Sequence, residues 1–408
     1  MVKLVHNPCE KIKSFGPYEV LETIGRGATA TVYKARDRRT DKVVAVKAGP
    51  KFMGLEPGAL ERFRREFTAI RDLRHPNLVS AIGLHEEDGV PCLIMEYVPG
   101  QNLENRIKER GTFSVERTVS LFVQVAEGLC YLHGKHLLHR DIKPSNIFLD
   151  GEDRAKLGDF GLLKMLMGDH QLTRSRQSMG TMEYGAPEQF EDAKRVDCRC
   201  DLYSLAATLY TALTSKFPFG NGGHLQSIQR KLLNQFVPLR LLLPSLDPAI
   251  DRLVNRCLDP KPSERPGSCD EFLAVLRQCE TRSATNSVEE EIFHHGNCKS
   301  AKGAERRASV RFEVGLTTTF VPFHQNMRGR WQATIIDVSS TGVRLQTTRS
   351  VAINSVLQIT LNPQAVPELV LVRWVKGNEG GTLILGCSFV RPLAEDQLKL
   401  TGAKFPAG

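Results

Sequence analysis

The run HRDIKPSN at positions 139–146 constrains the chemistry and the fold of this chain more than any other segment. It places a carboxylate that can act as a base (Asp141), a lysine that can reach a phosphate (Lys143) and an amide that can bind a metal ion (Asn146) in one short stretch. Transfer of a phosphoryl group to a hydroxyl needs such a set, because its transition state is stabilised mainly by positioning and charge neutralisation. Before the run, Ser114 can cap a buried helix whose apolar side chains recur at steps of three or four residues: Val115, Val119, Phe122, Ala126, Leu129 and Leu132.

Length and composition indicate several soluble domains. A chain of 408 residues is too long for one ordinary hydrophobic core. Its 41% hydrophobic and 25% charged residues are typical of globular proteins. The formal net charge of +9 is compatible with phosphate-bearing ligands, nucleic acid or an anionic membrane, and equally with basic residues spread over a large surface. Charge alone therefore selects no partner.

The cysteines and the apolar runs predict a cytoplasmic protein. Ten cysteines are scattered along the chain, and the tight pair Cys198 and Cys200 has no second pair that would complete a zinc site. Reduced thiols are therefore expected. The chain opens without a signal-peptide pattern and lacks a run of about 18 apolar residues, so no membrane-spanning helix is expected.

Composition also divides the chain into segments. We predict an N-terminal extension at residues 1–15, a large mixed domain at 16–280 and a polar linker at 281–303. Period-two patterns then predict the antiparallel strands of a small barrel at 304–400, before a tail at 401–408. The strand-like runs lie at 331–337, 356–361, 369–375 and 382–390.

Several motifs accompany HRDIKPSN in a fixed order, and together they resemble the eukaryotic-type serine/threonine protein kinases of bacteria over residues 16–280. They are GRGATA at 25–30, VAVK at 44–47, HPNLV at 75–79, DFG at 159–161, APE at 186–188 and KPSERP at 261–266. The resemblance implies an α+β chain, with a two-lobed protein kinase fold followed by the small antiparallel β-barrel. One departure from the family pattern is Ala30, which stands where the glycine-rich loop has its third glycine.

The resemblance implies an ATP site in the first part of this domain. Lys47 would hold the α- and β-phosphates, and Glu66 of a predicted helix would pair with it. Met95 would be the gatekeeper residue. The other implied ATP contacts are the glycine-rich loop, the residues around the adenine and the hinge backbone: Gly25, Gly27, Val32, Ala45, Glu96 and Val98.

The implied catalytic roles fall on HRDIKPSN and DFG. Asp141 would accept or orient the proton of the substrate hydroxyl, and Lys143 would steady the γ-phosphate. Asn146 and Asp159 would bind Mg²⁺ through oxygen atoms, which this hard cation prefers. Lys143, together with the GT pair at 180–181, indicates protein substrates with serine or threonine acceptors.

Further charged residues are implied to hold these parts in place. Glu188 would pair with Arg265, and Asp201 would brace the catalytic loop from a buried helix. Arg140 precedes the catalytic aspartate, and in this family such an arginine usually needs a phosphate on the activation segment. The candidate acceptors are Thr173, Ser175 and Ser178.

Two motifs distinguish the C-terminal segment. RRASVR at 306–311 alone fits a solvated surface or a nonspecific nucleic-acid patch, but with DVSSTG at 337–342 it resembles the cyclic di-GMP signature of PilZ domains. Arginine can pair with phosphate oxygens and guanine, and a carboxylate can accept from guanine N–H groups. The implied ligand residues are Arg306, Arg307, Arg311, Asp337, Ser339 and Gly342. Sparse aromatic residues disfavour a single-stranded nucleic-acid site.

We therefore predict an ATP- and Mg²⁺-dependent serine/threonine protein kinase that cyclic di-GMP regulates, with no nucleic-acid or membrane partner. Two alternatives remain open. The chain could be a catalytically weak ATP-binding scaffold that responds to cyclic di-GMP, or the β domain could only dock substrates or form a dimer.

Overall fold

The computed structural model divides the chain into two compact units. The first comprises Met1–Leu213 and Pro262–Arg277, and the second comprises Thr214–Lys261 and Gln278–Gly408. Residues 214–261, which lie inside the predicted kinase domain, therefore group with the C-terminal barrel. The structure describes residues 14–27, 30–49, 59–87, 89–159, 183–191, 196–220, 224–290, 312–323, 330–353, 355–361, 367–378, 381–390 and 393.

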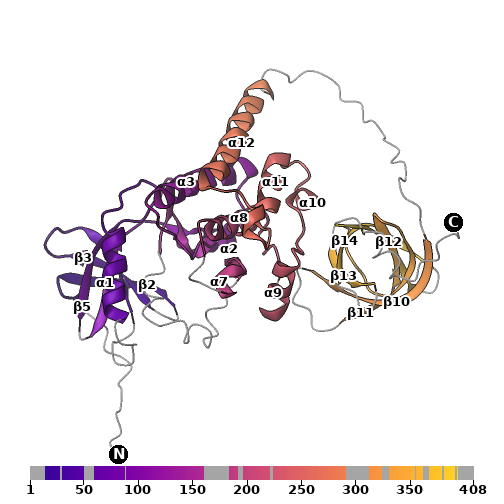
Figure 1. Ribbon diagram of the computed structural model, residues 1–408, viewed down its shortest axis with the longest axis horizontal. Coiled ribbons are helices and arrows are strands. Elements are labelled where there is room, and N and C mark those ends of the chain that lie inside the picture. Colours follow the sequence, from indigo (N-terminus) through magenta and orange to yellow (C-terminus); the bar gives the residue numbers. More distant parts are fainter. Residues whose placement is uncertain are drawn as a thin grey trace, which may run out of the picture. The chain divides into compact units, whose positions relative to one another are not determined.

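The first unit begins with a six-stranded antiparallel sheet in the order β1-β2-β3-β4-β6-β5. Its strands are β1 (Ser14–Phe15), β2 (Tyr18–Arg26), β3 (Thr31–Asp37), β4 (Val43–Ala48), β5 (Ala81–Glu87) and β6 (Val90–Glu96). Strand β4 is apolar except for Lys47, and every residue after Val43 is buried in this inner strand, which lies between β3 and β6. Helix α1 (Ala59–Ile70) contacts β5 (Figure 1).

The rest of the first unit is mainly helical. Helix α3 (Val115–Gly134) begins where predicted, and the Ser114 side chain accepts a hydrogen bond of 3.2 Å from the Arg117 backbone N–H. The predicted apolar stripe of α3 is buried except for Val115 in the first turn. Helix α8 (Arg199–Thr214) is buried along almost its whole length. The other elements are β7 (Gln101–Asn102), α2 (Leu103–Arg110), η1 (Pro144–Asn146), β8 (Ile147–Leu149), β9 (Ala155–Leu157), α7 (Glu188–Glu191), η3 (Pro262–Glu264) and the first part of α12 (Cys269–Glu290).

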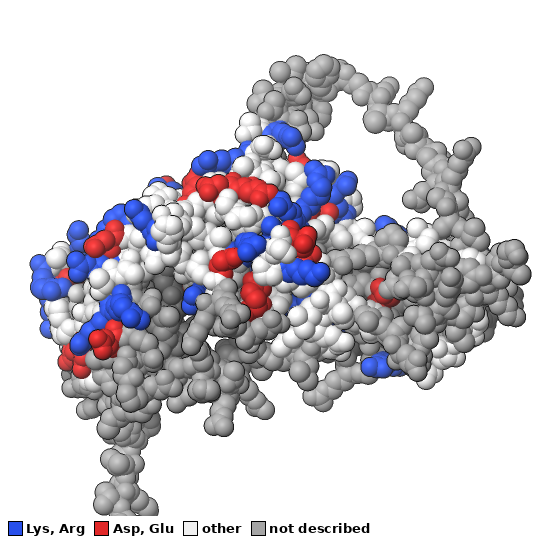
Figure 2. All heavy atoms as spheres, viewed as in Figure 1, with Lys and Arg blue, Asp and Glu red and all other residues white. Residues whose placement is uncertain are grey.

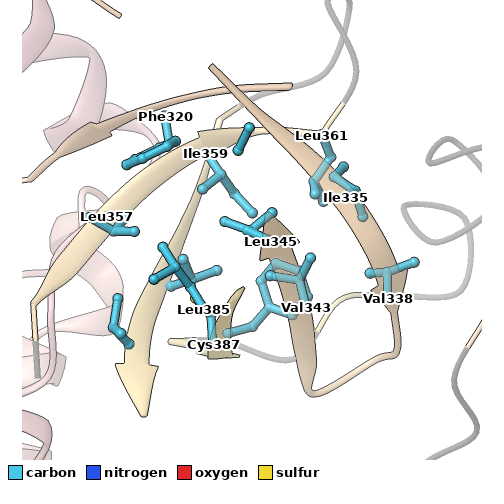
Figure 3. Packing of buried hydrophobic residues seen from close by; sticks show 14 of the residues in the cluster. Phe320, Ile335, Val338, Val343, Leu345, Leu357, Ile359, Leu361, Leu385 and Cys387 are labelled. Atoms are coloured by element: carbon cyan, nitrogen blue, oxygen red, sulfur yellow. The ribbon is translucent and has the colours of Figure 1, made fainter. Parts of the chain in front are cut away.

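The second unit contains a closed antiparallel barrel in the order β10-β11-β12-β15-β14-β13. The four predicted strands are confirmed as β11 (Trp331–Val338), β13 (Val356–Thr360), β14 (Glu368–Gly377) and β15 (Leu383–Phe389). Two further strands, β10 (Phe312–Pro322) and β12 (Gly342–Thr347), were not predicted. Alternate side chains, among them Ile335, Leu345 and Leu385, fill the barrel (Figure 3). Helices α9 (His224–Leu232), α10 (Leu239–Leu242), α11 (Pro248–Cys257) and the part of α12 from Gln278 onward complete the described elements of this unit.

The described surface carries charges of both signs. On the face shown in Figure 2, lysine and arginine lie among aspartate and glutamate, so the net charge of +9 gathers into no single basic patch on the visible described residues. None of the described helices has the length and apolar character to cross a bilayer. The described cysteines form no disulfide.

Candidate functional site

The run at 139–146 is organised around one buried carboxylate, that of Asp201 in α8. This carboxylate accepts hydrogen bonds from the backbone N–H groups of His139 at 2.9 Å and Arg140 at 2.7 Å, and its Oδ2 lies 3.0 Å from His133 Nε2. Burial alone would raise the pKa of Asp201, but these hydrogen bonds and the nearby histidines lower it below its ordinary value. Asp201 is therefore a charged acceptor that holds Arg140 in a left-handed backbone conformation, with φ of 63°.

His139 connects this loop to the segment that carries Asp159. Its ring is buried, and burial lowers the pKa of the imidazole below its ordinary value. The neutral ring donates from Nε2 to the Gly158 carbonyl at 3.1 Å, while the Gly158 N–H donates to the Asn146 carbonyl at 2.9 Å. These bonds fix the two predicted metal ligands, Asn146 and Asp159, relative to each other.

Asp141 lies among the polar groups that the sequence predicts around it. Asn146 Nδ2 donates to the Asp141 carbonyl at 2.7 Å and to its carboxylate Oδ2 at 2.9 Å. Lys143 Nζ lies 3.1 Å from the same Oδ2. Because Asp141 and Asn146 are both buried, these bonds hold the carboxylate in one orientation. The loop therefore brings together the three residues that HRDIKPSN singled out.

Lys47 of β4 joins the sheet to the catalytic residues through an ion pair with Asp159. The lysine is 8% exposed, so its ammonium group is largely removed from water and depends on this partner. Asp159 adopts a left-handed backbone conformation with φ of 61°. The predicted partner of Lys47, Glu66, lies in α1, but its side chain is outside the described residues. The Lys47–Glu66 pair therefore stays a prediction.

Residues predicted to surround ATP lie on adjacent strands. In the register of the sheet, Gly25 of β2 is opposite Val32 of β3, and Val32 is opposite Lys47 of β4. Ala45 of β4 is likewise opposite Met95 of β6. Antiparallel pairing thus gathers residues that are far apart in the sequence along two neighbouring lines across the sheet, one through Lys47 and one through Ala45.

The glycine-rich turn and the hinge are defined by backbone hydrogen bonds. The Gly27 N–H donates to the Ala30 carbonyl at 2.9 Å, which closes the described part of the turn. The Glu96 N–H donates to the Ser80 carbonyl at 2.9 Å, so this N–H is engaged within the protein. Val98, just after β6, is partly exposed. An ATP contact by the Glu96 or Val98 backbone stays a prediction.

Glu188 and Arg265 form the predicted ion pair. The guanidinium donates to the two carboxylate oxygens at 2.6 Å and 2.9 Å, a bidentate geometry. The Arg265 side chain is fully buried, and its guanidinium carbon lies 4.9 Å from the centre of the Tyr203 ring. The pair anchors α7, which follows the activation segment in the sequence.

In the barrel, the DVSSTG motif forms the turn from β11 to β12. The buried Ser339 hydroxyl accepts from the Gly342 N–H at 3.1 Å and donates to the Gly342 carbonyl at 3.2 Å. A Cβ on Gly342 would lie 2.6 Å from the Cys387 carbonyl oxygen, so this position requires glycine. Two of the three predicted ligand residues in the motif therefore shape the turn itself.

Asp337, the third, forms an ion pair with Arg344 of β12. The Asp337 side chain is buried, whereas that of Arg344 is 41% exposed. Sequence reasoning missed Arg344, although the two residues are partners in the β11–β12 register. Recognising DVSSTG as a hairpin turn would have revealed the pair. His133 near the end of α3 was also missed; it is partly buried, and its Nε2 lies 3.0 Å from the Asp201 carboxylate.

Some predicted residues lie outside the described part of the chain. They are Arg306, Arg307 and Arg311 of the basic motif, and Thr173, Ser175 and Ser178 of the activation segment.

Comparison with known families assigns most of the chain to two domains. The protein kinase domain matches residues 18–275, and the PilZ domain matches residues 305–403. The first match contains Asp201, Asp141 and Lys47 and all the residues described above as their hydrogen-bond or ion-pair partners. The second contains the DVSSTG turn.

Relatives and a solved structure agree with the first match. A probable serine/threonine-protein kinase of Clostridium perfringens is 30% identical over 281 residues, which cover 68% of this chain and 41% of the relative. Serine/threonine-protein kinase PrkC of Bacillus subtilis is 30% identical over 263 residues, covering 64% and 40%. The crystal structure of Rad53 1-466 in complex with AMP-PNP superposes with a TM-score of 0.54 at 25% identity and covers 64% of each chain. The chain thus spans less than half of the length of these two curated relatives.

Proposed function

Because the chain belongs to the protein kinase family, we propose that it transfers the γ-phosphoryl group of ATP to serine and threonine hydroxyls of protein substrates. One observation supports this proposal most: hydrogen bonds and ion pairs connect the predicted catalytic side chains with one another. These are Lys47, Asp141, Lys143, Asn146 and Asp159. A C-terminal PilZ domain makes cyclic di-GMP the proposed regulatory ligand.

Asp141 is the residue proposed to meet the substrate hydroxyl. Two donors, Asn146 Nδ2 and Lys143 Nζ, hold its carboxylate, so the carboxylate needs little reorganisation before it accepts or orients the hydroxyl proton. Lys143, whose Nζ lies 3.1 Å from the Asp141 carboxylate, would contribute positive charge to the phosphoryl group during transfer. A positioned base of this kind usually contributes about 10²–10⁴-fold to the rate.

Asn146 and Asp159 fit the binding of Mg²⁺. The Asn146 amide nitrogen donates to Asp141, which leaves the amide oxygen as the atom that can bind a cation. Asp159 offers carboxylate oxygens that can bind the cation. These oxygens now pair with the Lys47 ammonium group, which would face the phosphates once the nucleotide is bound. Bound there, Mg²⁺ would neutralise phosphate charge, while the protein side chains hold the nucleotide and the hydroxyl.

The acceptor type is tested with the full chain, ATP and Mg²⁺. Mass spectrometry of the autophosphorylated protein and of a serine- and threonine-rich test protein should locate phosphate on serine and threonine. The Asp141→Ala variant should add no phosphate. Phosphate found only on tyrosine would contradict the proposed acceptor type. Undiminished transfer by the variant would contradict the proposed role of Asp141, and absence of transfer by the unmodified chain would favour the ATP-binding scaffold.

Cyclic di-GMP binding is proposed for the PilZ domain, with Asp337 accepting from guanine and the arginines of RRASVR contacting the phosphates. A ligand at one hundred times its Kd stabilises a folded domain by about 2.7 kcal/mol, so thermal unfolding of the full chain should report binding. The shift should vanish in a variant that combines Arg307→Ala and Arg311→Ala. Persistent binding in this variant would favour a barrel that only docks substrates or forms a dimer.

Regulation itself is tested by the transfer rate at saturating cyclic di-GMP. A coupling free energy of about 1–3 kcal/mol would change affinity or activity several-fold to about 100-fold.

A further inference from the structure

A segment of the kinase domain packs against the wall of the barrel within the second unit. Residues 214–261 belong to the kinase match, yet they group with the barrel. Val237 is buried in one apolar cluster with residues of the barrel, and Leu241 and Leu242 pack on this cluster. The barrel members are Phe323, Val356, Leu369 and Leu371.

The alternation of side chains in β13 and β14 explains why this wall needs a cover. Leu357 and Val370 belong to the barrel core, whereas their neighbours Val356 and Leu371 belong to the outer cluster. Val356 and Leu371 are also register partners, so they present one apolar surface. The outer face of this hairpin is therefore apolar at Val356, Leu369 and Leu371, and the segment around Val237 removes these side chains from water.

Arg230 of α9 holds the polar edge of the contact. Its side chain is 3% exposed, and the guanidinium donates to the Phe219 carbonyl at 2.9 Å and to Gln358 Oε1 of β13. Its guanidinium carbon lies 4.2 Å from the centre of the Phe323 ring. Burial lowers the pKa of Arg230 to about 10, so the charge is costly to bury and depends on these partners.

Two further contacts show how closely the surfaces approach. A Cβ on Gly220, whose φ is 70°, would lie 2.6 Å from the Phe323 carbonyl oxygen and 2.6 Å from Arg230 Nη1. Glycine is therefore required for this approach. Gln235 Nε2 donates to the Pro367 carbonyl at 2.7 Å. The contact thus combines an apolar centre with hydrogen bonds at its edge, as specific interfaces do.

The covalent chain links this contact to the catalytic loop. Helix α8 carries Asp201 in its first turn, where the carboxylate holds the backbone of His139 and Arg140. The same helix ends at Thr214, shortly before Phe219, whose carbonyl accepts from Arg230. A buried helix transmits displacement because close-packed interiors resist compression.

We propose that the outer face of β13 and β14 is a docking surface for the described residues 217–220 and 224–242 of the kinase domain. We further propose that this contact carries the ligand state of the barrel through α8 to the catalytic loop. The first statement is independent of the proposed function. The second rests on the proposed regulation by cyclic di-GMP.

Hydrogen exchange of the full chain tests the docking surface. Leu369→Asp places a charge in the apolar centre, and Gln358→Ala removes the acceptor of Arg230. Both should accelerate amide exchange in residues 224–242 about tenfold or more, as expected when a hydrogen bond to a charged group is lost. Exchange in β11 should stay unchanged. The control Lys376→Asp replaces a positive charge by a negative one at an exposed position of β14 and should leave residues 224–242 protected.

If Leu369→Asp unfolds the barrel, exchange in β11 will accelerate as well. In that case Gln358→Ala alone decides the test. Unchanged exchange in residues 224–242 of Gln358→Ala would overturn the docking surface.

The relay from the barrel to the catalytic loop is tested by a ratio of two rates, the transfer rate at saturating cyclic di-GMP divided by the transfer rate without it. This ratio should approach one in Gln358→Ala, and an unchanged ratio beside accelerated exchange would overturn the relay. A ratio of one in the unmodified chain would instead end the proposed regulation, while the exchange experiment still decides the docking surface.

Discussion

The carboxylate of Asp201 accepts a hydrogen bond of 2.7 Å from the backbone N–H of Arg140. This bond fixes the residue that precedes Asp141 in a left-handed conformation, which a non-glycine residue adopts at a cost. A buried residue of α8 thus sets the direction in which the catalytic loop presents its carboxylate.

Replacing this acceptor should disable the loop. In Asp201→Asn, the buried N–H groups of His139 and Arg140 lose a charged partner, so we expect a loss of stability of about 1–3 kcal/mol and a fall in phosphoryl transfer. Denaturant unfolding and the transfer rate measure the two effects. Asp72→Asn, at an exposed aspartate, is the matched control and should change neither. If Asp201→Asn has the same free energy of unfolding and the same transfer rate as the unmodified chain, Asp201 does not hold the loop.

The buried imidazole of His139 predicts a pH dependence of stability. Its pKa in the folded chain lies below the ordinary value, so the unfolded chain binds the proton more readily. Stability is complete above the ordinary histidine pKa and falls as pH decreases through it, by at most about 1.4 kcal/mol per pH unit for one proton. His139→Gln lacks this proton, so its deficit relative to the unmodified chain should shrink between pH 7 and pH 5. A deficit that grows over this range would contradict burial of a neutral imidazole. Asp201, whose pKa is also lowered, would weaken the fold only at more acidic pH.

Arg344 should stabilise the barrel through Asp337. Removing the guanidinium in Arg344→Ala leaves a buried carboxylate with one partner fewer, and we expect a cost of about 1–3 kcal/mol. The double variant with Asp337→Asn should recover part of this cost, because the buried charge is then absent. A thermodynamic cycle from urea unfolding measures the coupling. Strictly additive effects would show that the pair contributes nothing.

Gly342 should tolerate no side chain. In Gly342→Ala, the new Cβ would lie 2.6 Å from the Cys387 carbonyl oxygen, and β12 or β15 must move to relieve the clash. We expect a destabilisation of about 1–3 kcal/mol and weaker cyclic di-GMP binding. Gly377→Ala is the matched control, because an added Cβ there meets nothing within 4 Å. Equal unfolding temperatures for the two variants would contradict the close approach of β12 and β15.

Local signals predicted the elements that depend on neighbouring residues in the sequence. The Ser114 cap and the apolar stripe of α3 were correct, because both follow from side chains within a few turns of one helix. The barrel strands with a clear period of two were also correct. Strand β12 was missed although Val343 and Leu345 alternate with Arg344 and Gln346, because the strand has only six residues.

Contacts between distant residues needed more than local pattern. The Glu188–Arg265 pair followed only from family resemblance, because nothing in either segment specifies the other. The Asp337–Arg344 pair follows from the register that the DVSSTG turn sets, with Val338 opposite Val343 and Asp337 opposite Arg344, and it was missed because the turn was read only as a ligand motif. The contact of Arg230 with the barrel depends on folding of two segments more than a hundred residues apart, and no local rule predicts such a pairing.

The most direct test of the central claim is the rate of phosphoryl transfer from labelled ATP by the full chain and by Asp141→Asn, with nucleotide binding measured in parallel. Asparagine keeps the size of the side chain and one acceptor oxygen, so the fold and ATP affinity should persist within a few-fold. Removing the base should slow transfer by at least about 100-fold. Transfer by Asp141→Asn at the rate of the unmodified chain, with ATP bound equally well, would contradict the account.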